Sequence, residues 1–198
     1  EEPSGMEIST LRLAGDLVIP NFPPTAIAGP DRVSPTGHAV RLDGRSSFDI
    51  EGAALSYLWK AIDVPNGSTY AAELSTGTTI DDGDADGVTT VFGFSIGTLP
   101  AWVSAGDILR VSGIRAVIAT VNNPGGQLTV TTDVVPDNLS ATPFRIIRQS
   151  LLVGSTTETP YFIPDVPGIY RFELVVNDGE SNSEPSEVLA SIVSARAP

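Results

Sequence analysis

The stretch LSYLWK at residues 55–60 decides the fold, because its large apolar residues occupy every second position. Leu55, Tyr57 and Trp59 share one side of the chain if it is extended, and this period of two predicts a β-strand with one buried face. The stretch YRFELVV at residues 170–176 has the same pattern. We expect these two stretches to be the central strands of a β-sandwich.

The region between the two stretches is too long for an ordinary connection. More than one hundred residues separate them, whereas sandwich strands are normally joined by short loops. The sequence DVPGIY at residues 165–170 places Tyr170 at the start of a strand, after a glycine turn. This order is typical of a tyrosine corner, which fixes a connection between two sheets. We therefore expect a sandwich that is interrupted by an inserted segment.

Composition supports an all-β protein and excludes several classes. The chain has 198 residues, 19 of them glycine and 16 proline, and these are spread along its length as expected for many short strands and turns. It has no cysteine, so disulfides and thiolate sites are excluded. The net charge of −13 argues against a nucleic-acid partner. No apolar run approaches the roughly 18 residues of a membrane span.

Several segments resemble one known family. They are PTAIAGPD (24–31), VRLDGRSSFD (40–49), the Y-x-W strand (57–59), PNGS (65–68), TPYFIPD (159–165) and VVNDGES (175–181). Together they closely resemble the polycystic-kidney-disease (PKD) domain, over residues 24–75 and 151–195. The resemblance implies an immunoglobulin-like β-sandwich of about seven strands. It also implies a spacer or adhesion module, not a catalyst.

Residues 76–150 form the expected insert. Its candidate strands are residues 88–96, 108–111, 115–121, 127–132 and 144–148. The turn NNPGG at 122–126 predicts a hairpin from Ala116 to Val130. Five short strands fit a small β-barrel of SH3-like or OB-like type. The order GDILRVSG (106–113), QLTVTT (127–132) and FRIIR (144–148) resembles small β-modules of tailed-bacteriophage structural proteins.

Residues 1–23 form an N-terminal arm that ends in the chain-breaking sequence PNFPP at 20–24. The arm is either a flexible linker, or else an added strand or an intersubunit contact. Its aliphatic residues favour the contact, because a disordered linker carries fewer of them.

Asp82, Asp84 and Asp86 are the candidate metal ligands. They lie in DGDADG at 82–87, which matches the opening of a calcium loop. An EF-hand needs glutamate at the twelfth loop position, where this chain has Gly93, so an EF-hand is excluded. The remaining interpretations are a weaker calcium turn and an acidic solvated loop. No other cofactor is expected.

The PKD resemblance implies a second calcium position at Asp43, Asp49 and Glu51. Ala53 replaces the last aspartate of the family pattern, which weakens this prediction. The alternative is a capped turn, in which Asp43 and Asp49 accept backbone N–H bonds.

No catalytic constellation is evident, so we expect no enzyme. His38 is the only histidine, and no motif supplies it with an orienting carboxylate. Trp102 lies in a proline-containing loop and either packs into the open end of the small barrel or docks a sugar or a partner.

Two functions remain open. The first is a virion protein of a tailed bacteriophage, in the head decoration or the tail, which contacts other coat proteins in a multi-copy assembly. The second is an adhesion or accessory module of a secreted or cell-surface bacterial protein, which binds glycan, matrix protein or calcium. The insert and the apolar arm favour the first.

Overall fold

A computed structural model describes residues 20–80, 88–89, 91–94, 99–122, 127–130, 135–136 and 139–195. Most of the expected arm and all of Asp82, Asp84 and Asp86 lie outside these residues. In the part that is described, the protein is all-β, as predicted, and its helical content is a single 3₁₀ turn, η1 (Gln149–Leu151).

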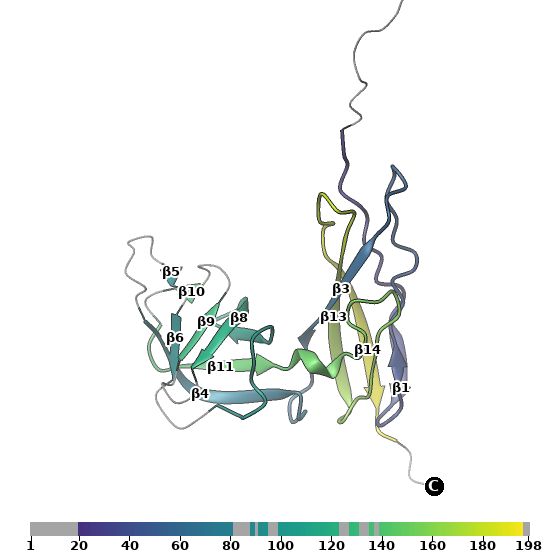
Figure 1. The fold of residues 1–198 in the computed structure, drawn as a ribbon. Coiled ribbons are helices and arrows are strands. Elements are labelled where there is room, and N and C mark those ends of the chain that lie inside the picture. The colour runs from purple at the N-terminus through teal and green to yellow at the C-terminus, as the bar shows by residue number, and fades with distance from the viewer. Residues whose placement is uncertain are drawn as a thin grey trace, which may run out of the picture.

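The strands pair in four groups, which Figure 1 shows as two bodies side by side. The first body contains β1 (Arg32–Pro35), β2 (Val40–Arg41), β3 (Ser56–Asp63), β12 (Tyr161–Phe162), β13 (Gly168–Asn177) and β14 (Ser186–Val193). The second contains β4 (Ala71–Ile80), β5 (Val88–Thr89), β6 (Val91–Phe94), β7 (Ile108–Val111), β8 (Ile114–Asn122), β9 (Gln127–Val130), β10 (Val135–Pro136) and β11 (Thr142–Ile147).

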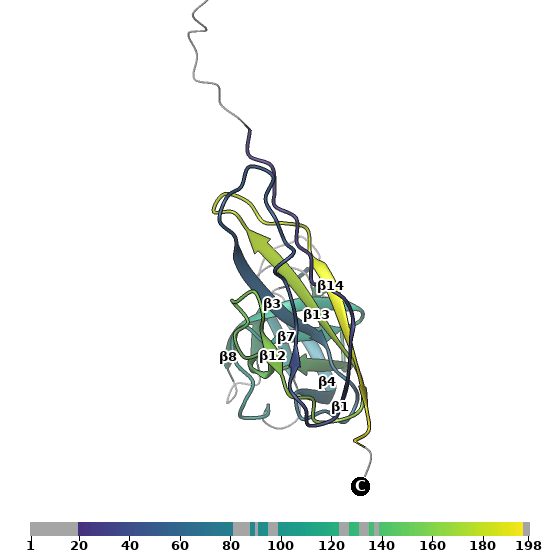
Figure 2. The same cartoon turned by 90° about the vertical axis from the view of Figure 1, so that its right-hand side faces the viewer.

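The first body has a four-stranded sheet in the order β1-β14-β13-β3, with the pair β12-β2 beside it (Figure 2). Alternate residues of β13 point into one core, so Tyr170, Phe172, Leu174 and Val176 are all fully buried there. Trp59 of β3 joins this core and lies opposite Leu174 in the antiparallel pair. The alternation expected in both stretches is therefore confirmed.

The position of β3 corrects one expectation. Of the two strands that were expected to be central, β13 is an interior strand, whereas β3 lies at the edge of the sheet. No further strand of the sheet covers this edge in the described part of the chain. The segment that follows the insert covers it, without being a strand itself. The Trp59 N–H donates to the Ser155 carbonyl at 2.8 Å, and the Ala61 N–H donates to the Gln149 side chain at 2.9 Å. Covering an edge in this way satisfies its backbone groups and prevents pairing with another chain.

The tyrosine corner is present. The Tyr170 hydroxyl donates toward the Val166 carbonyl and the Asp165 carboxylate, at 3.1 and 2.7 Å, and accepts the Val166 N–H. Asp165 also accepts the Ser68 hydroxyl, so the corner is tied to the turn at 65–68. A side chain at Gly168 would meet the Pro65 ring at 2.6 Å, which explains the glycine.

We predict that Tyr170→Phe lowers stability by about 1 kcal/mol at neutral pH, the usual value of one hydrogen bond. Burial, assisted by the bond to Asp165, raises the pKa of Tyr170 to about 12. The folded state therefore keeps this proton more tightly than the unfolded chain, so its stabilising effect is lost as pH rises from about 10 to about 12. Tyr170→Phe has no hydroxyl to titrate at this position, so this part of the alkaline destabilisation should be absent from the variant.

Urea unfolding of both proteins at about pH 8 and about pH 11 measures this difference. Tyr70→Phe is the matched control, because the Tyr70 hydroxyl also donates to a carbonyl, that of Ile163, but in an exposed position. Equal alkaline destabilisation in the wild type and Tyr170→Phe would contradict the prediction.

The second body is a six-stranded sheet that closes on itself in the order β11-β4-β6-β9-β8-β7, with β7 pairing back to β11. The small pair β5-β10 lies at its end away from the first body (Figure 1). We call the closed sheet the ring. Its interior is a separate apolar core that contains Leu109, Ile118, Leu128, Phe144 and Ile146. The expected hairpin is confirmed, since β8 and β9 pair from Asn122 and Gln127.

The chain enters the ring through β4 and leaves it through β11. These strands pair from Ala71 and Ile147, and the Arg148 N–H continues the ladder to the Tyr70 carbonyl at 2.8 Å. The insert was expected to begin at residue 76. β4 crosses this boundary, and its pairing with β11 of the ring begins at Ala71. Entry and exit are therefore adjacent, as an insertion between β3 and β12 requires.

Candidate functional site at the junction of the two bodies

We call the first body the sandwich, because its four-stranded sheet and the pair β12-β2 both contribute side chains to one core. The ring meets the sandwich through a row of apolar residues on the outer face of the ring. Ala71, Ile147, Ile108 and Val117 lie side by side on four neighbouring strands, because each is the register partner of the next. All four pack with the sandwich core and not with the ring interior. Leu151, which follows β11, joins the same cluster. The two bodies thus share one continuous apolar contact.

A row of arginines lies two residues further along the same strands. Arg145 of β11 pairs in register with Arg110 of β7, which in turn pairs with Arg115 of β8. Alternation along a strand places them on the outer face with the apolar row. Like charges directly opposite each other on a sheet destabilise it. The row therefore needs carboxylates, and most of them come from the sandwich.

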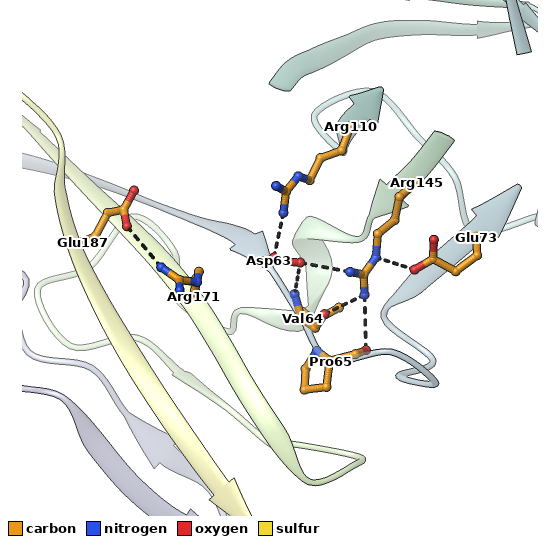
Figure 3. Close-up of polar contacts among 8 residues, drawn as sticks. All are labelled: Asp63, Val64, Pro65, Glu73, Arg110, Arg145, Arg171 and Glu187. Atoms are coloured by element: carbon orange, nitrogen blue, oxygen red, sulfur yellow. Dashed lines mark hydrogen bonds and ion pairs between the residues drawn. The ribbon is translucent and has the colours of Figure 1, made fainter. Parts of the chain in front are cut away.

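Asp63, at the end of β3, is the central carboxylate (Figure 3). It binds Arg145 Nη1 at 3.0 Å through one oxygen and Arg110 Nη1 at 2.7 Å through the other. Arg145 also contacts Glu73 at 2.8 Å and donates to the carbonyls of Val64 and Pro65, at 2.6 and 3.2 Å. One guanidinium thus joins β4 of the ring to the chain that leaves β3.

Glu173 matches the third arginine. Its carboxylate is buried on the outer face of β13 and binds Arg115. Nearby, Arg171 and Glu187 form a looser, exposed pair at 4.0 Å (Figure 3). Among the described residues, each arginine of the row has at least one acidic partner, so the junction is balanced in charge.

Asp107 and Gln149 form a second link between the bodies. Asp107 is buried and accepts the Gln149 N–H at 2.8 Å and the Ser104 N–H at 2.9 Å. The Gln149 side chain binds both backbone groups of Ala61, at 2.9 and 2.8 Å. Burial raises the pKa of Asp107, although these N–H bonds oppose the shift. Its oxygens are occupied by backbone donors, so its role is structural.

A crevice of about 460 Å³ lies between the turn that joins β7 to β8 and the four-stranded sheet of the first body. Ile62, Asp63, Arg110, Arg115 and Glu187 contribute to its lining. Its polar groups are the members of the same ion pairs. The crevice is thus lined by members of the ion pairs that fix the ring on the sandwich.

The acidic residues implied by the PKD resemblance do not gather into a metal site. Asp43 binds Arg45 Nε and Nη2, at 2.9 and 2.8 Å, and accepts the Arg45 N–H. Asp49 accepts the Ala53 N–H at 2.9 Å. Glu51 is exposed. The capped-turn interpretation of Asp43 and Asp49 is thus confirmed. No group of three metal-ligating side chains occurs in the described part of the chain, which does not include Asp82, Asp84 and Asp86.

Trp102 and His38 both have local partners. Trp102 is half-buried against the ring core, and the Arg148 guanidinium lies 5.7 Å from the centre of its ring. Of the two interpretations of Trp102, this arrangement agrees with packing against the small barrel. His38 is exposed in the turn after β1, and its Nδ1 lies 3.3 Å from the Thr36 carbonyl. No described helix is long and apolar enough to cross a membrane.

Comparison with known proteins adds little to this geometry. No family description and no curated protein sequence matches the chain. One solved structure, a nucleoside hydrolase-related hypothetical protein from Saccharophagus degradans that is associated with carbohydrate metabolism, aligns with 14% identity and a TM-score of 0.40. The alignment covers 87% of this chain and 26% of that one, so the chain spans about a quarter of that protein's length. A superposition this loose bears on neither fold nor function.

Proposed function

We propose that this is a non-catalytic structural protein, built as a PKD-type sandwich with an inserted small barrel, that works through protein–protein contacts. We place it in the virion of a tailed bacteriophage, as a multi-copy component of the head decoration or the tail. The observation that carries the proposal is the junction. Its apolar row and arginine row hold two small β-bodies together, as expected of a part that must present two surfaces in a fixed arrangement.

The polar chemistry of the junction supports a structural role. Asp63, Glu73 and Glu173 are all engaged by arginines. A general acid or base must lie within reach of a proton of its substrate. These carboxylates are instead turned toward guanidinium groups and take part in joining the two bodies.

An exposed apolar surface supports protein contacts. Val33 of β1 and Ile169 of β13 are both register partners of Ser191 and are 76% and 50% exposed. Val193, two residues further along β14, is 52% exposed. These three side chains lie on the outer face of the sheet, and grouped exposed apolar side chains often mark interaction sites.

We predict that the protein is recovered from purified particles in a fixed copy ratio, and that deletion of residues 1–19 abolishes this attachment without unfolding the sandwich. The fold should survive because Asn21, just beyond the deletion, is already anchored to Asp178 at 2.9 Å and Ser181 at 3.1 Å. Sedimentation with particles measures attachment, and circular dichroism of the deleted protein is the control.

The alternative, an adhesion module of a secreted or cell-surface bacterial protein, gives a different result in the same experiment. Such a module would bind glycan or matrix protein through its loops and would tolerate loss of the arm. Saturable binding to a glycan panel, with no association to particles, would overturn the virion proposal.

A further inference from the structure

A groove of about 600 Å³ lies between β1 and β2, away from the junction. One wall comes from Arg32, Val33 and Ser34, and the other from residues 39–43 with Arg45. β1 pairs only with β14 among the described strands, so its second edge is unpaired. The extended chain continues beyond β2, because the N–H groups of Leu42 and Gly44 donate to the carbonyls of Pro160 and Glu158.

Three arginines converge on this groove in a protein whose net charge is −13. Arg41 comes from β2, Arg45 lies in the turn that follows Gly44, and Arg32 lines the groove from β1. Asp43 is the only acidic residue of the lining, and it is bound to Arg45. The bond to Asp43, together with the nearby charge of Glu158, raises the pKa of Arg45. Arg41 and Arg32 carry no acidic partner in any described ion pair, and the lining keeps an excess of positive charge.

Two arginines of the groove are held by the protein itself. The Arg32 Nε atom is buried. Arg41 is held in place by Tyr161, with its guanidinium 5.6 Å from the ring centre. The hydrogen bonds from Arg45, with help from the charge of Arg32, lower the pKa of Asp43 to about 2.

We propose that this groove binds an extended acidic segment of a partner protein, whose carboxylates are accepted by Arg32, Arg41 and Arg45. This inference rests on the proposed function, because it names the chemistry of one protein contact. Arginine forks bind carboxylates in a planar, two-bonded manner that lysine does not provide. An extended segment presents alternate side chains on one face, so its carboxylates can meet Arg32 of β1 and Arg41 of β2 from within the groove. The unpaired edge of β1 adds backbone groups that suit a polypeptide.

The test is binding of a fluorescein-labelled peptide of alternating glutamate and threonine residues to the full chain, followed by fluorescence anisotropy. We expect saturable binding that weakens as salt is added. Arg32→Gln, Arg41→Gln and Arg45→Gln together should weaken it at least about tenfold. Arg171→Gln is the matched control, since it removes one charge outside the groove and should change the affinity by less than about twofold.

Two results would overturn the inference. One is equal affinity of the triple variant and the wild type. The other is binding of heparin, a sulfated polysaccharide, to the groove arginines while the acidic peptide does not bind. Both are measured on the isolated protein, so they are independent of whether it is recovered from particles. Failure of the virion proposal and failure of this inference are therefore distinguishable.

Discussion

Replacing Trp59 by alanine is expected to lower the free energy of unfolding by about 3–5 kcal/mol, the usual cost of truncating a large buried side chain. Trp59 is 2% exposed, and its indole N–H donates to the Thr157 carbonyl at 3.1 Å. A side chain at Gly44 would approach the indole to 3.1 Å, which shows how closely the neighbouring chain packs on it. The loss would be a large part of a typical domain's stability.

Trp102→Ala is the control for this experiment, because the chain has two tryptophans and Trp102 is only half-buried. Its loss should cost about 1–2 kcal/mol, since much of its surface remains in water. Urea denaturation followed by circular dichroism compares the two variants. An unchanged midpoint for Trp59→Ala would mean that the buried face of β3 had been assigned to the wrong side.

The all-β class and the buried faces of β3 and β13 could be predicted from sequence because their signals are local. Period-two alternation in residues 55–60 and 170–176 identified the buried faces, and the order of Gly168 and Tyr170 identified the corner. The edge position of β3 could not be predicted in this way. It depends on Gln149 and Ser155, which lie far along the chain and cover β3 without themselves forming a strand.

The junction was missed because its pattern exists only across strands. Arg110, Arg115 and Arg145 are dispersed in sequence and become neighbours only when the ring's register is known. One signal was available. The chain has only 11 basic residues, and these three lie within or beside the apolar strand patterns of the insert. A charge placed there requires an acidic partner, and the sequence alone does not show that Asp63 and Glu173 supply it.

Arg145→Ala is expected to destabilise the protein by about 2–3 kcal/mol and to uncouple its two bodies. The substitution removes the contacts to Asp63 and Glu73 and leaves the Val64 and Pro65 carbonyls without this donor. Arg145 and Asp63 are partly buried, and removing one partner of such a pair leaves the other partner and the carbonyls incompletely solvated, whereas the exposed Glu73 is rehydrated. Asp63 keeps Arg110, which limits the loss.

The two tryptophans report on this uncoupling, since Trp59 lies in the sandwich core and Trp102 packs against the ring core. Trp59→Phe and Trp102→Phe each leave one reporter. With Arg145 present, the fluorescence midpoint of each variant should coincide with the circular-dichroism midpoint of the same variant, because the apolar row joins the bodies into one cooperative unit. With Arg145→Ala, the two midpoints should separate.

Arg171→Ala is the matched control for Arg145→Ala, because its pair with Glu187 is exposed and 4.0 Å long. It should change stability by less than about 0.5 kcal/mol. Arg145→Lys separates charge from geometry, since lysine keeps the charge but cannot reach two carboxylates and two carbonyls at once. Coincident midpoints in Arg145→Ala, with stability equal to that of Arg171→Ala, would show that the apolar row alone holds the ring on the sandwich.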